Sequence, residues 1–451
     1  MHACDYPTLK IPAKLNLSSH WYLYPRSAFP YPSRISLFQP ANMVSTEAER
    51  YQPQRLSYFN HALAIHKVDF PIYYIECLSE RHFIIAGGGG SSKTGVHNQI
   101  NIMELVPAGN SCAADLILKF HTPEEIPDAI MNGSLMRSMP LVNTRLITGG
   151  QRPVSYHIIF NPCSKKFEIN HYEILDDELP MTDTKCVKCT PSKLFAGTID
   201  GHLTVWKVSS DDKRMERRIR AHSKEIDEVD IDPISKQIVT LSRSEGRCAV
   251  WNMSNLELVK EFKKDFINRS GGGNIGGAKL CYRSCRFTYD AITEQSETPQ
   301  DSYLVIICNS VPKGSSQVFR WNTKNLEKST SALLCDDNVM AMTVSLDGKF
   351  IGVGTRSGSV LVIRTKDFKR IYKINGAHTS AVTNLGFLTP KPESLSLTNC
   401  DICPLLSVSI DRRIVLHRPR GNSLALDATK IIVIVLIIYI SFYILYKNYT
   451  D

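Results

Sequence analysis

Short apolar segments separated by polar turns recur along the chain from about residue 61 to residue 420. Residues 81–86 contain a continuous apolar run typical of a buried strand. Residues 99–105 alternate apolar and polar side chains with the period of two that a half-buried strand shows. Turns rich in glycine, asparagine, aspartate and serine lie between such segments. The pattern predicts an all-β fold built from consecutive short strands.

One position marks a repeat within this pattern. Trp206, Trp251 and Trp321 each end a strand-like segment that follows a turn. Four other residues take the same place: Met103, Phe160, Ile363 and His417. These seven marks are 42 to 70 residues apart, which is the spacing of four-stranded propeller blades with insertions, as in WD repeats. We therefore predict a seven-bladed WD-repeat β-propeller, closed by a strand near residues 62–68 that pairs with the last blade.

Two sets of polar residues in the repeats could be mistaken for catalytic groups. His378, Ser409 and Asp411 have the composition of a nucleophilic triad. In WD blades, however, a histidine, a serine or threonine, a turn aspartate and the tryptophan form a buried structural network. A parallel set stands in another repeat: His222, Ser242, Glu245 and Trp251. We interpret both sets, with Trp206 and Trp321, as structural, and we expect no catalytic triad and no bond-breaking chemistry.

A glycine-rich loop separates two of the predicted strands. Its sequence contains Gly87-Gly88-Gly89-Gly90 and then Gly95-Val96-His97-Asn98. Four consecutive glycines destabilise a helix or a strand, so the run indicates a loop that needs backbone freedom or bare backbone at a surface. A Walker A loop is disfavoured because Lys93-Thr94 follows serine and the next element is a strand. A dinucleotide-binding turn also needs a helix, and a merely flexible linker is the plainer alternative.

The amino-acid composition limits the classes of partner that the protein is expected to bind. The formal net charge is +9 and the pI is about 8.8, a mild excess that suits an acidic partner or a membrane surface. Because no aromatic and basic stripe or nucleic-acid motif is present, we expect no nucleic-acid binding. Thirteen scattered cysteines and the lack of an N-terminal signal sequence indicate reduced thiols. Cys186 and Cys189 are more than 200 residues from Cys400 and Cys403, so we expect no zinc site.

The end of the chain has the composition of a membrane anchor. Residues 431–446 are uncharged and almost wholly apolar. With Ala428 and Thr429, and interrupted by Lys430, they barely reach the length of a membrane-spanning helix. Basic residues precede this segment: Arg412, Arg413, Arg418, Arg420 and Lys430. Their excess predicts that the propeller faces the cytoplasm. The short apolar length suits a thin bilayer, so we expect a single-pass, tail-anchored protein of the endoplasmic reticulum membrane.

These patterns divide the chain into five parts. We expect a disordered extension at 1–60, the cytosolic propeller at 61–420, a linker at 421–428, a transmembrane anchor at 429–446 and a short luminal tail at 447–451. Two insertions in the propeller, residues 268–277 and 390–404, are expected to be surface loops.

The glycine loop and its flanks resemble a known family. Phe70-Pro71-Ile72-Tyr73, the strand that follows, and the loop from Gly87 to Asn98 are similar to the first blade of the membrane-anchored exchange factors for the Sar-type small GTPase. This is the family of the prolactin regulatory element-binding protein, and the resemblance extends over about residues 62–446. The 60-residue extension departs from the family core, and only three of the seven blade marks are tryptophan.

The resemblance implies a guanine-nucleotide exchange factor. Such a protein would release GDP from the Sar-type GTPase at the endoplasmic reticulum and so initiate formation of coat protein complex II vesicles. Coat or scaffold proteins of exit sites are candidate partners. In the family, a potassium ion orders the glycine loop, which contacts the GTPase near its nucleotide.

Carried over by position, the resemblance also implies the site residues. The partner-binding loop contains Gly87, Gly88, Gly89, Gly90, Gly95, Val96 and Asn98, and the functionally important asparagine of the family falls on Asn98. The backbone carbonyls of Gly88, Gly89, Gly90 and Gly95 are candidate potassium ligands. Two other hypotheses stay open: a membrane-tethered WD-repeat adaptor without exchange activity, and a hydrolase or nucleotide-binding enzyme.

Overall fold

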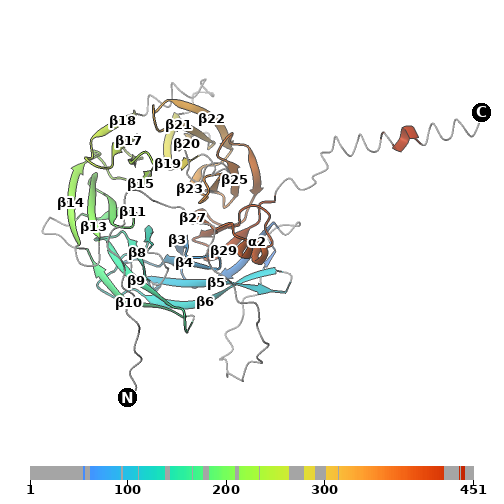
Figure 1. Ribbon diagram of the computed structural model, residues 1–451, viewed down its shortest axis with the longest axis horizontal. Helices are drawn as coiled ribbons and strands as arrows, with labels where there is room; N and C mark the ends of the chain where they lie inside the picture. Colours follow the sequence, from blue (N-terminus) through green and yellow to red (C-terminus); the bar gives the residue numbers. More distant parts are fainter. Residues whose placement is uncertain are drawn as a thin grey trace, which may run out of the picture.

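The strands of the protein form a ring of antiparallel sheets (Figure 1). The computed structural model describes residues 54–55, 61–92, 95–109, 111–137, 143–164, 166–175, 182–208, 213–232, 234–263, 279–289, 301–312, 314–420, 436 and 438–441. Within these residues there are seven sheets, and each is one blade. The predicted seven-bladed propeller is therefore confirmed.

We number the blades in chain order. Blade 1 contains β3 (Ile72–Cys77), β4 (His82–Gly87), β5 (Gln99–Ala108) and β6 (Ser111–His121), and blade 2 contains β7 (Gly133–Met136), β8 (Asn143–Thr148), β9 (Val154–Asn161) and β10 (Lys166–Ile174). Blade 3 contains β11 (Thr184–Cys189), β12 (Lys193–Thr198), β13 (His202–Val208) and β14 (Lys213–Arg220), and blade 4 contains β15 (Glu228–Asp232), β16 (Gln237–Ser242), β17 (Arg247–Asn252) and β18 (Leu258–Lys263).

The remaining blades follow the same plan. Blade 5 contains β19 (Lys279–Tyr289), β20 (Ser302–Val311), β21 (Ser316–Asn322) and β22 (Lys328–Cys335), and blade 6 contains β23 (Val339–Val344), β24 (Phe350–Thr355), β25 (Val360–Arg364) and β26 (Arg370–Ile374). Blade 7 contains β27 (Val382–Phe387), β28 (Leu405–Ser409), β29 (Arg413–His417), β2 (Ala62–Lys67) and β1 (Gln54–Arg55). All seven marks of the sequence repeat lie on the third strand of their blade.

Blade 7 closes the ring with strands from both ends of the propeller. In the antiparallel pair of β2 and β29, Ala62 lies opposite His417 and Lys67 lies opposite Arg413. The amide of Arg418 donates to the carbonyl of His61 at 2.9 Å and extends this pairing by one step. Closure removes the free edge of the ring, which would otherwise present unpaired backbone groups. The predicted closure is therefore confirmed.

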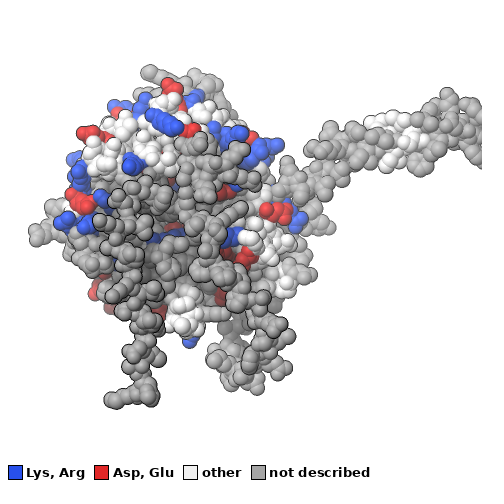
Figure 2. Space-filling model, in the orientation of Figure 1, with Lys and Arg blue, Asp and Glu red and all other residues white. Residues whose placement is uncertain are grey.

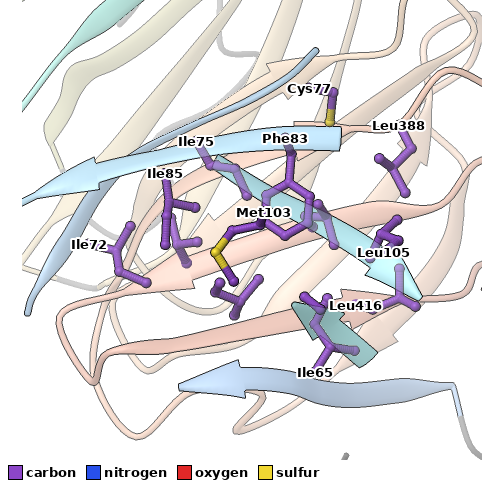
Figure 3. Close-up of a cluster of buried hydrophobic side chains, with 14 of the residues drawn as sticks. Ile65, Ile72, Ile75, Cys77, Phe83, Ile85, Met103, Leu105, Leu388 and Leu416 are labelled. Carbon is purple, nitrogen blue, oxygen red and sulfur yellow. The ribbon is translucent and has the colours of Figure 1, made fainter. Parts of the chain in front are cut away.

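A buried cluster joins blade 7 to blade 1 (Figure 3). Ile65 of β2 and Leu416 of β29 contribute to it from blade 7, whereas Phe83 and Met103 contribute from β4 and β5. Phe83 and Met103 are fully buried. Met103 thus packs in the core at the position that tryptophan takes in other blades. Each inter-blade seam needs such packing because a blade cannot bury both of its faces alone.

Blade 4 contains the complete structural network that the sequence pattern suggests. The Nδ1 of His222 lies 2.8 Å from Oε2 of Glu245, and its Nε2 lies 2.8 Å from the hydroxyl of Thr240. The indole Nε1 of Trp251 donates to the same hydroxyl at 2.8 Å. Burial alone would raise the pKa of Glu245, but the hydrogen bond to His222, the charge of His222 and the hydrogen bonds from Ser223 together outweigh burial, so the pKa is lowered.

Blade 7 has a variant of this network. The Nδ1 of His378 lies 3.0 Å from Asp411, and its Nε2 lies 2.7 Å from the hydroxyl of Ser407. His417 stands where tryptophan stands in blade 4, and its Nε2 lies 2.7 Å from Ser407. The hydroxyl of Tyr372 lies 2.8 Å from Nδ1 of His417 and also donates to the carbonyl of His61 at 2.9 Å. The network therefore reaches the strand that closes the ring.

The sequence analysis assigned the wrong hydroxyl-bearing residue, Ser242 or Ser409, to each of these two networks. Ser242 accepts a hydrogen bond from the amide of Glu245 at 3.4 Å, and Ser409 donates to the carbonyl of Ala381 at 2.8 Å. Each lies at the end of its strand, where the following turn or the neighbouring strand uses its hydroxyl. Thr240 and Ser407 stand two residues earlier on the same faces and meet the imidazole rings.

The insertion at residues 390–404 is partly helical, which corrects the expectation of a loop. Helix α2 (Pro392–Thr398) begins with a proline at its first position, where the missing amide hydrogen costs nothing, and ends at Asn399 in the left-handed conformation. It lies beside blade 1 and packs against β5 and β6 (Figure 1). The other insertion, residues 268–277, lies outside the described residues.

Several sequence predictions concern the ends of the chain. The predicted extension at 1–60 is described only at Gln54–Arg55, which pairs with β2. The linker at 421–428 and the tail at 447–451 lie outside the described residues, as does most of 429–446. In the part of the chain that the structure describes, no helix is long and apolar enough to cross a membrane.

Replacing Phe83 with alanine should weaken the seam between blades 7 and 1. Phe83 is fully buried, and removal of a buried aromatic side chain costs about 3–5 kcal/mol of unfolding free energy. Denaturant titration of the full chain in detergent measures this loss. Leu116→Ala is the control because Leu116 is 45% exposed, and we expect it to change the free energy by no more than about 0.5 kcal/mol. Equal losses in both variants would contradict the proposed role of the seam.

His417 should make the stability of the ring depend on pH. Burial, and then the nearby His378, lower the pKa of His417 well below its ordinary value of 6.5. As the pH falls below 6.5, the unfolded chain therefore binds a proton that the folded chain does not, and stability is lost. His417→Gln removes this group, so the slope of unfolding free energy against pH should decrease by up to about 1.4 kcal/mol per pH unit. If the wild type and His417→Gln show identical slopes between pH 7 and pH 5, this prediction is wrong.

Candidate functional site

The glycine loop joins β4 to β5 in blade 1 and has a buried base and an exposed tip. Gly87 and Gly88 are buried at the base, whereas Ser91, Ser92 and Gly95 are exposed. Lys93 and Thr94, between them, lie outside the described residues. The tip is therefore accessible to another molecule, while its base belongs to the rigid blade.

Close approach of other backbone makes glycine necessary at the base. A Cβ at Gly87 would lie 2.0 Å from the carbonyl oxygen of Pro71, far inside the contact distance of real side chains. Gly88 has a φ of +140°, and a Cβ there would lie 2.3 Å from Oδ1 of Asn98 and 2.8 Å from the carbonyl oxygen of His97. The amide of Gly88 donates to Pro71 at 3.2 Å. The loop is thus fitted closely to the segment before β3, which contains Pro71.

Asn98 fastens the two arms of the loop together and to the next blade. Its Oδ1 accepts a hydrogen bond from the amide of Gly90 at 2.8 Å, and its Nδ2 donates to the carbonyl of Pro127 at 2.8 Å. The carbonyl of Asn98 accepts from the amide of Thr122 at 2.9 Å. Both ends of the side-chain amide are therefore used within the protein. Asn98 positions the loop from its half-buried place at the base.

Further hydrogen bonds join residues within the loop. The amide of Gly89 donates to the carbonyl of Val96 at 3.3 Å, and the hydroxyl of Ser92 donates to the carbonyl of Gly89 at 2.7 Å. The bonds from Gly89 to Val96 and from Gly90 to Asn98 join the two arms, whereas the bond from Ser92 to Gly89 closes a turn within the first arm. These contacts give the described part of the loop a defined conformation.

The segment that links blade 1 to blade 2 supports the loop from one side. Ile126 and Ile130 anchor this segment in the core, and Ala129 lies 3.6 Å from the place where a Cβ of Gly90 would be. The carboxylate of Asp128 accepts from the amide of Gln151 in blade 2 at 2.8 Å. Sequence reasoning missed this support because these residues are 28 or more positions from Asn98 and carry no motif.

A polar cluster holds the start of β5 below the loop. Gln99 is 2% exposed, and its Nε2 donates to Oδ1 of Asp69 at 2.9 Å. Lys119 of β6 lies 3.2 Å from Oδ2 of the same carboxylate. Burial alone would raise the pKa of Asp69, but the hydrogen bond from Gln99 and the charge of Lys119 outweigh burial, so the pKa is lowered. This carboxylate therefore stays ionised and pins both strands beside the loop.

The structure brings together all the site residues that were predicted in the loop. Gly87, Gly88, Gly89, Gly90, Gly95, Val96 and Asn98 lie in one projection. The residues interpreted as structural lie elsewhere, in blades 3, 4, 5 and 7: Trp206, Trp251, Trp321, His222, His378 and Asp411. The exposed surface beside the loop includes Met131, which is 60% exposed, and the carboxylates of Glu124 and Glu125.

Oδ1 of Asn98 and the carbonyl oxygen of His97 lie close to Gly88, and the Cα of Asn98 lies equally close, 2.5 Å from the place of a Cβ. These atoms pack against the glycine itself. The potassium ligands expected from the sequence, Gly88, Gly89, Gly90 and Gly95, therefore stay a prediction. Cys186 and Cys189 lie in blade 3 and Cys400 and Cys403 in blade 7. Among the described residues, no cluster of three histidine, cysteine or acidic side chains could bind a metal.

Comparisons with known proteins agree with this geometry. No protein-family model matches the chain. The chain is 23% identical over 394 residues to the guanine nucleotide-exchange factor SEC12 of Rattus norvegicus, covering 78% of this chain and 89% of that protein. Its identity to the SEC12 of Mus musculus is also 23%, over 400 residues with the same coverage. SEC12-like protein 2 of Arabidopsis thaliana is 27% identical over 231 residues, 49% of this chain and 47% of that protein.

A solved structure supports the fold alone. The crystal structure of Chaetomium thermophilum Sqt1 has a TM-score of 0.52 and 14% identity, and the match covers 81% of this chain and 87% of that one. The similarity to the SEC12 proteins extends over most of the chain, and it confirms the family resemblance drawn from the glycine loop and the blades. The protein is therefore a relative of the SEC12 guanine nucleotide-exchange factors.

Proposed function

We propose that this protein is a guanine-nucleotide exchange factor that releases GDP from a Sar-type small GTPase. The observation that carries the proposal is the glycine loop, an exposed tip on a base locked by Asn98, in a chain similar to named exchange factors over most of its length. The adaptor hypothesis is not favoured, because the rat and mouse relatives are named as exchange factors.

Exchange of this kind needs differential binding. The factor binds the nucleotide-free GTPase more tightly than the GDP-bound form, and by linkage the nucleotide then binds more weakly. A thousandfold loss of nucleotide affinity corresponds to about 4 kcal/mol of differential binding. A loop of defined conformation suits this task because little of its binding energy is lost in ordering the loop.

In this proposal Asn98 is a positioning residue. Its amide is bonded to Gly90 and Pro127, so it holds the tip in place, and the tip touches the GTPase. Exposed groups beside the tip extend the contact surface, among them Ser91, Ser92 and Met131. Each blade packs against two neighbours in the closed ring. Binding of the GTPase would therefore displace blade 1 very little.

We further propose that a potassium ion stiffens the loop. The backbone oxygens of Gly88, Gly89, Gly90 and Gly95 would hold it. The ion supplies a fixed charge that draws carbonyl oxygens together. The chain itself contributes positive φ angles at Gly88, Gly90 and Gly95, which turn the backbone tightly without steric strain.

The place of action in the proposal is the endoplasmic reticulum. The apolar segment at 431–446 would anchor the chain with the propeller in the cytoplasm, where it would start coat protein complex II assembly and meet coat or scaffold proteins of exit sites. On the face in Figure 2, Lys and Arg side chains alternate with Asp and Glu around the rim. Such a mixed surface is suited to protein partners and gives no continuous basic stripe for nucleic acid.

Asn98→Ala should slow nucleotide exchange. The change leaves the amide of Gly90 and the carbonyl of Pro127 without their partner, which costs up to about 1–3 kcal/mol for each of these half-buried groups and frees the tip. Release of a fluorescent GDP from the Sar-type GTPase by the full chain in detergent measures the rate. We expect at least a tenfold loss, about 1.4 kcal/mol of lost transition-state stabilisation.

The matched control for this experiment is Asn325→Ala. Asn325 is an exposed turn asparagine in blade 5 whose Oδ1 accepts from the amide of Glu327 at 3.0 Å. Its loss should leave the exchange rate unchanged. If the wild-type protein does not accelerate GDP release, the proposed function is wrong. Stable binding of the GTPase without faster GDP release would support the adaptor hypothesis instead.

Replacing potassium with lithium should also slow exchange. Lithium is too small for carbonyl oxygens that a larger ion holds apart, so the loop loses its order. Amide hydrogen exchange over residues 87–98 should become faster in lithium, and the rate of GDP release should fall several-fold. Asn325→Ala in blade 5 is the control and should show the same difference between the two salts as the wild type. Equal loop protection in the two salts would remove potassium from the proposal and leave exchange itself untouched.

A further inference from the structure

A second candidate site lies at the seam where the ring closes, away from the glycine loop. Helix α2 of blade 7 and the turn between β5 and β6 of blade 1 enclose a cleft of about 410 Å³. Figure 1 shows α2 beside the far end of these two strands. This volume is within the range of small-molecule pockets, roughly 300–1,000 Å³. The polar residues of its lining include Arg81, Glu393, Asn399 and Arg418, and Pro107 and Leu397 contribute apolar surface.

Arg418 is the unusual member of this lining. It follows β29 directly, and its backbone amide bonds to His61 at the closing strand pair. The residue is only 3% exposed, yet Nε and Nη2 of its guanidinium are buried without a hydrogen-bond partner. These two atoms form one edge of the planar group, and their hydrogens point in parallel. Such an edge matches two oxygens of a phosphate or a carboxylate. Each of the two atoms exposes less than 1 Å², so a ligand in the cleft reaches this edge when the side chain of Arg418 turns toward it.

The groups around Arg418 do not neutralise it. Burial lowers the pKa of its guanidinium, and the neighbours that act on it are the thiols of Cys112 and Cys400, the charge of Arg420 and the hydroxyl of Tyr372. No described ion pair involves Arg418. A buried cation without a counter-charge is costly, so a ligand that brings an anionic group would be bound at this place.

A second arginine faces the same cleft. Arg81 lies 3.7 Å from Glu393 and 3.4 Å from Glu104, so its ion pairs are long, and its Nε is buried without a partner. Two guanidinium groups and one carboxylate thus line the cleft, with Arg420 close by. A phosphate group fits this set better than a carboxylate does, because it carries more charge and offers three oxygens to donors on different sides.

We propose that this cleft binds the phosphate group of a small phosphomonoester, with Arg418 as the bidentate anchor and Arg81 as the second cation. The volume leaves room for an organic group beside the phosphate, which comes either from a soluble metabolite or from a lipid headgroup. Because Arg418 borders the strand pair that closes the ring and α2 belongs to the last blade, a bound phosphate stabilises the seam.

Thermal unfolding of the full chain in detergent tests the proposal. Inorganic phosphate should raise the unfolding midpoint in a saturable way, and sodium chloride at equal ionic strength should not. Arg418→Lys keeps the charge but removes the two-donor edge, so the apparent dissociation constant should increase at least tenfold. Arg81→Gln should weaken binding in the same direction. Arg370→Gln is the matched control, since Arg370 is exposed on β26 and should leave phosphate binding unchanged.

The source of the phosphate is distinguished with two esters. Glycerol 3-phosphate and dihexanoyl phosphatidic acid carry the same phosphomonoester, and only the second has acyl chains. Tighter binding of the lipid identifies a headgroup, whereas equal binding identifies a soluble phosphomonoester.

Three results would overturn the site. They are a midpoint shift with phosphate no larger than with chloride, an Arg418→Lys protein that binds like the wild type, or equal weakening by Arg370→Gln. If Arg418→Lys shows no cooperative unfolding in chloride, the phosphate affinity of Arg81→Gln alone tests the site, and an affinity equal to that of the wild type would overturn it. The measurement uses no GTPase, so its outcome does not depend on the proposed exchange activity.

Discussion

The pairing of β2 with β29 is the interaction on which the rest of the structure depends. It joins the two ends of the propeller, so that blade 7 is built from strands that are more than 300 residues apart in the sequence. The hydrogen-bonded chain from His378 through Ser407 and His417 to Tyr372 ends at the same strand. Backbone pairing, a buried polar network and the apolar cluster around Phe83 all act at one seam. Because a ring is rigid only when it is closed, this seam sets the stiffness of every blade.

The glycine loop makes use of that stiffness. Blade 1 contains the loop, and blade 1 lies directly against the closing blade. The loop is fixed to Pro71 before its own blade and to Pro127 on the way to the next, so it cannot shift without moving its neighbours. A loop held in this way would keep its conformation when it binds a partner. The proposed exchange activity therefore depends on contacts far from the nucleotide.

Sequence reasoning identified most of the fold because its signals are local and repeated. The seven blade marks were found because each lies on the third strand of its blade, and strand periodicity is visible over a few residues. The serine assignments failed because Ser242 and Thr240 share one face of a strand, and only the register shows which hydroxyl meets His222. The support of the loop by Pro127 and Asp128 was also invisible, since it joins residues of two blades. The cleft at Arg418 requires the path of α2, which a loop prediction cannot supply.

The oxygens that crowd Gly88 couple two positions of the loop that are ten residues apart. A larger residue at position 88 would displace the Asn98 side chain, which accepts from the amide of Gly90. A change at position 88 therefore also removes what Asn98 contributes. The energetic effects of substitutions at the two positions are consequently not additive, because both act through the same contact.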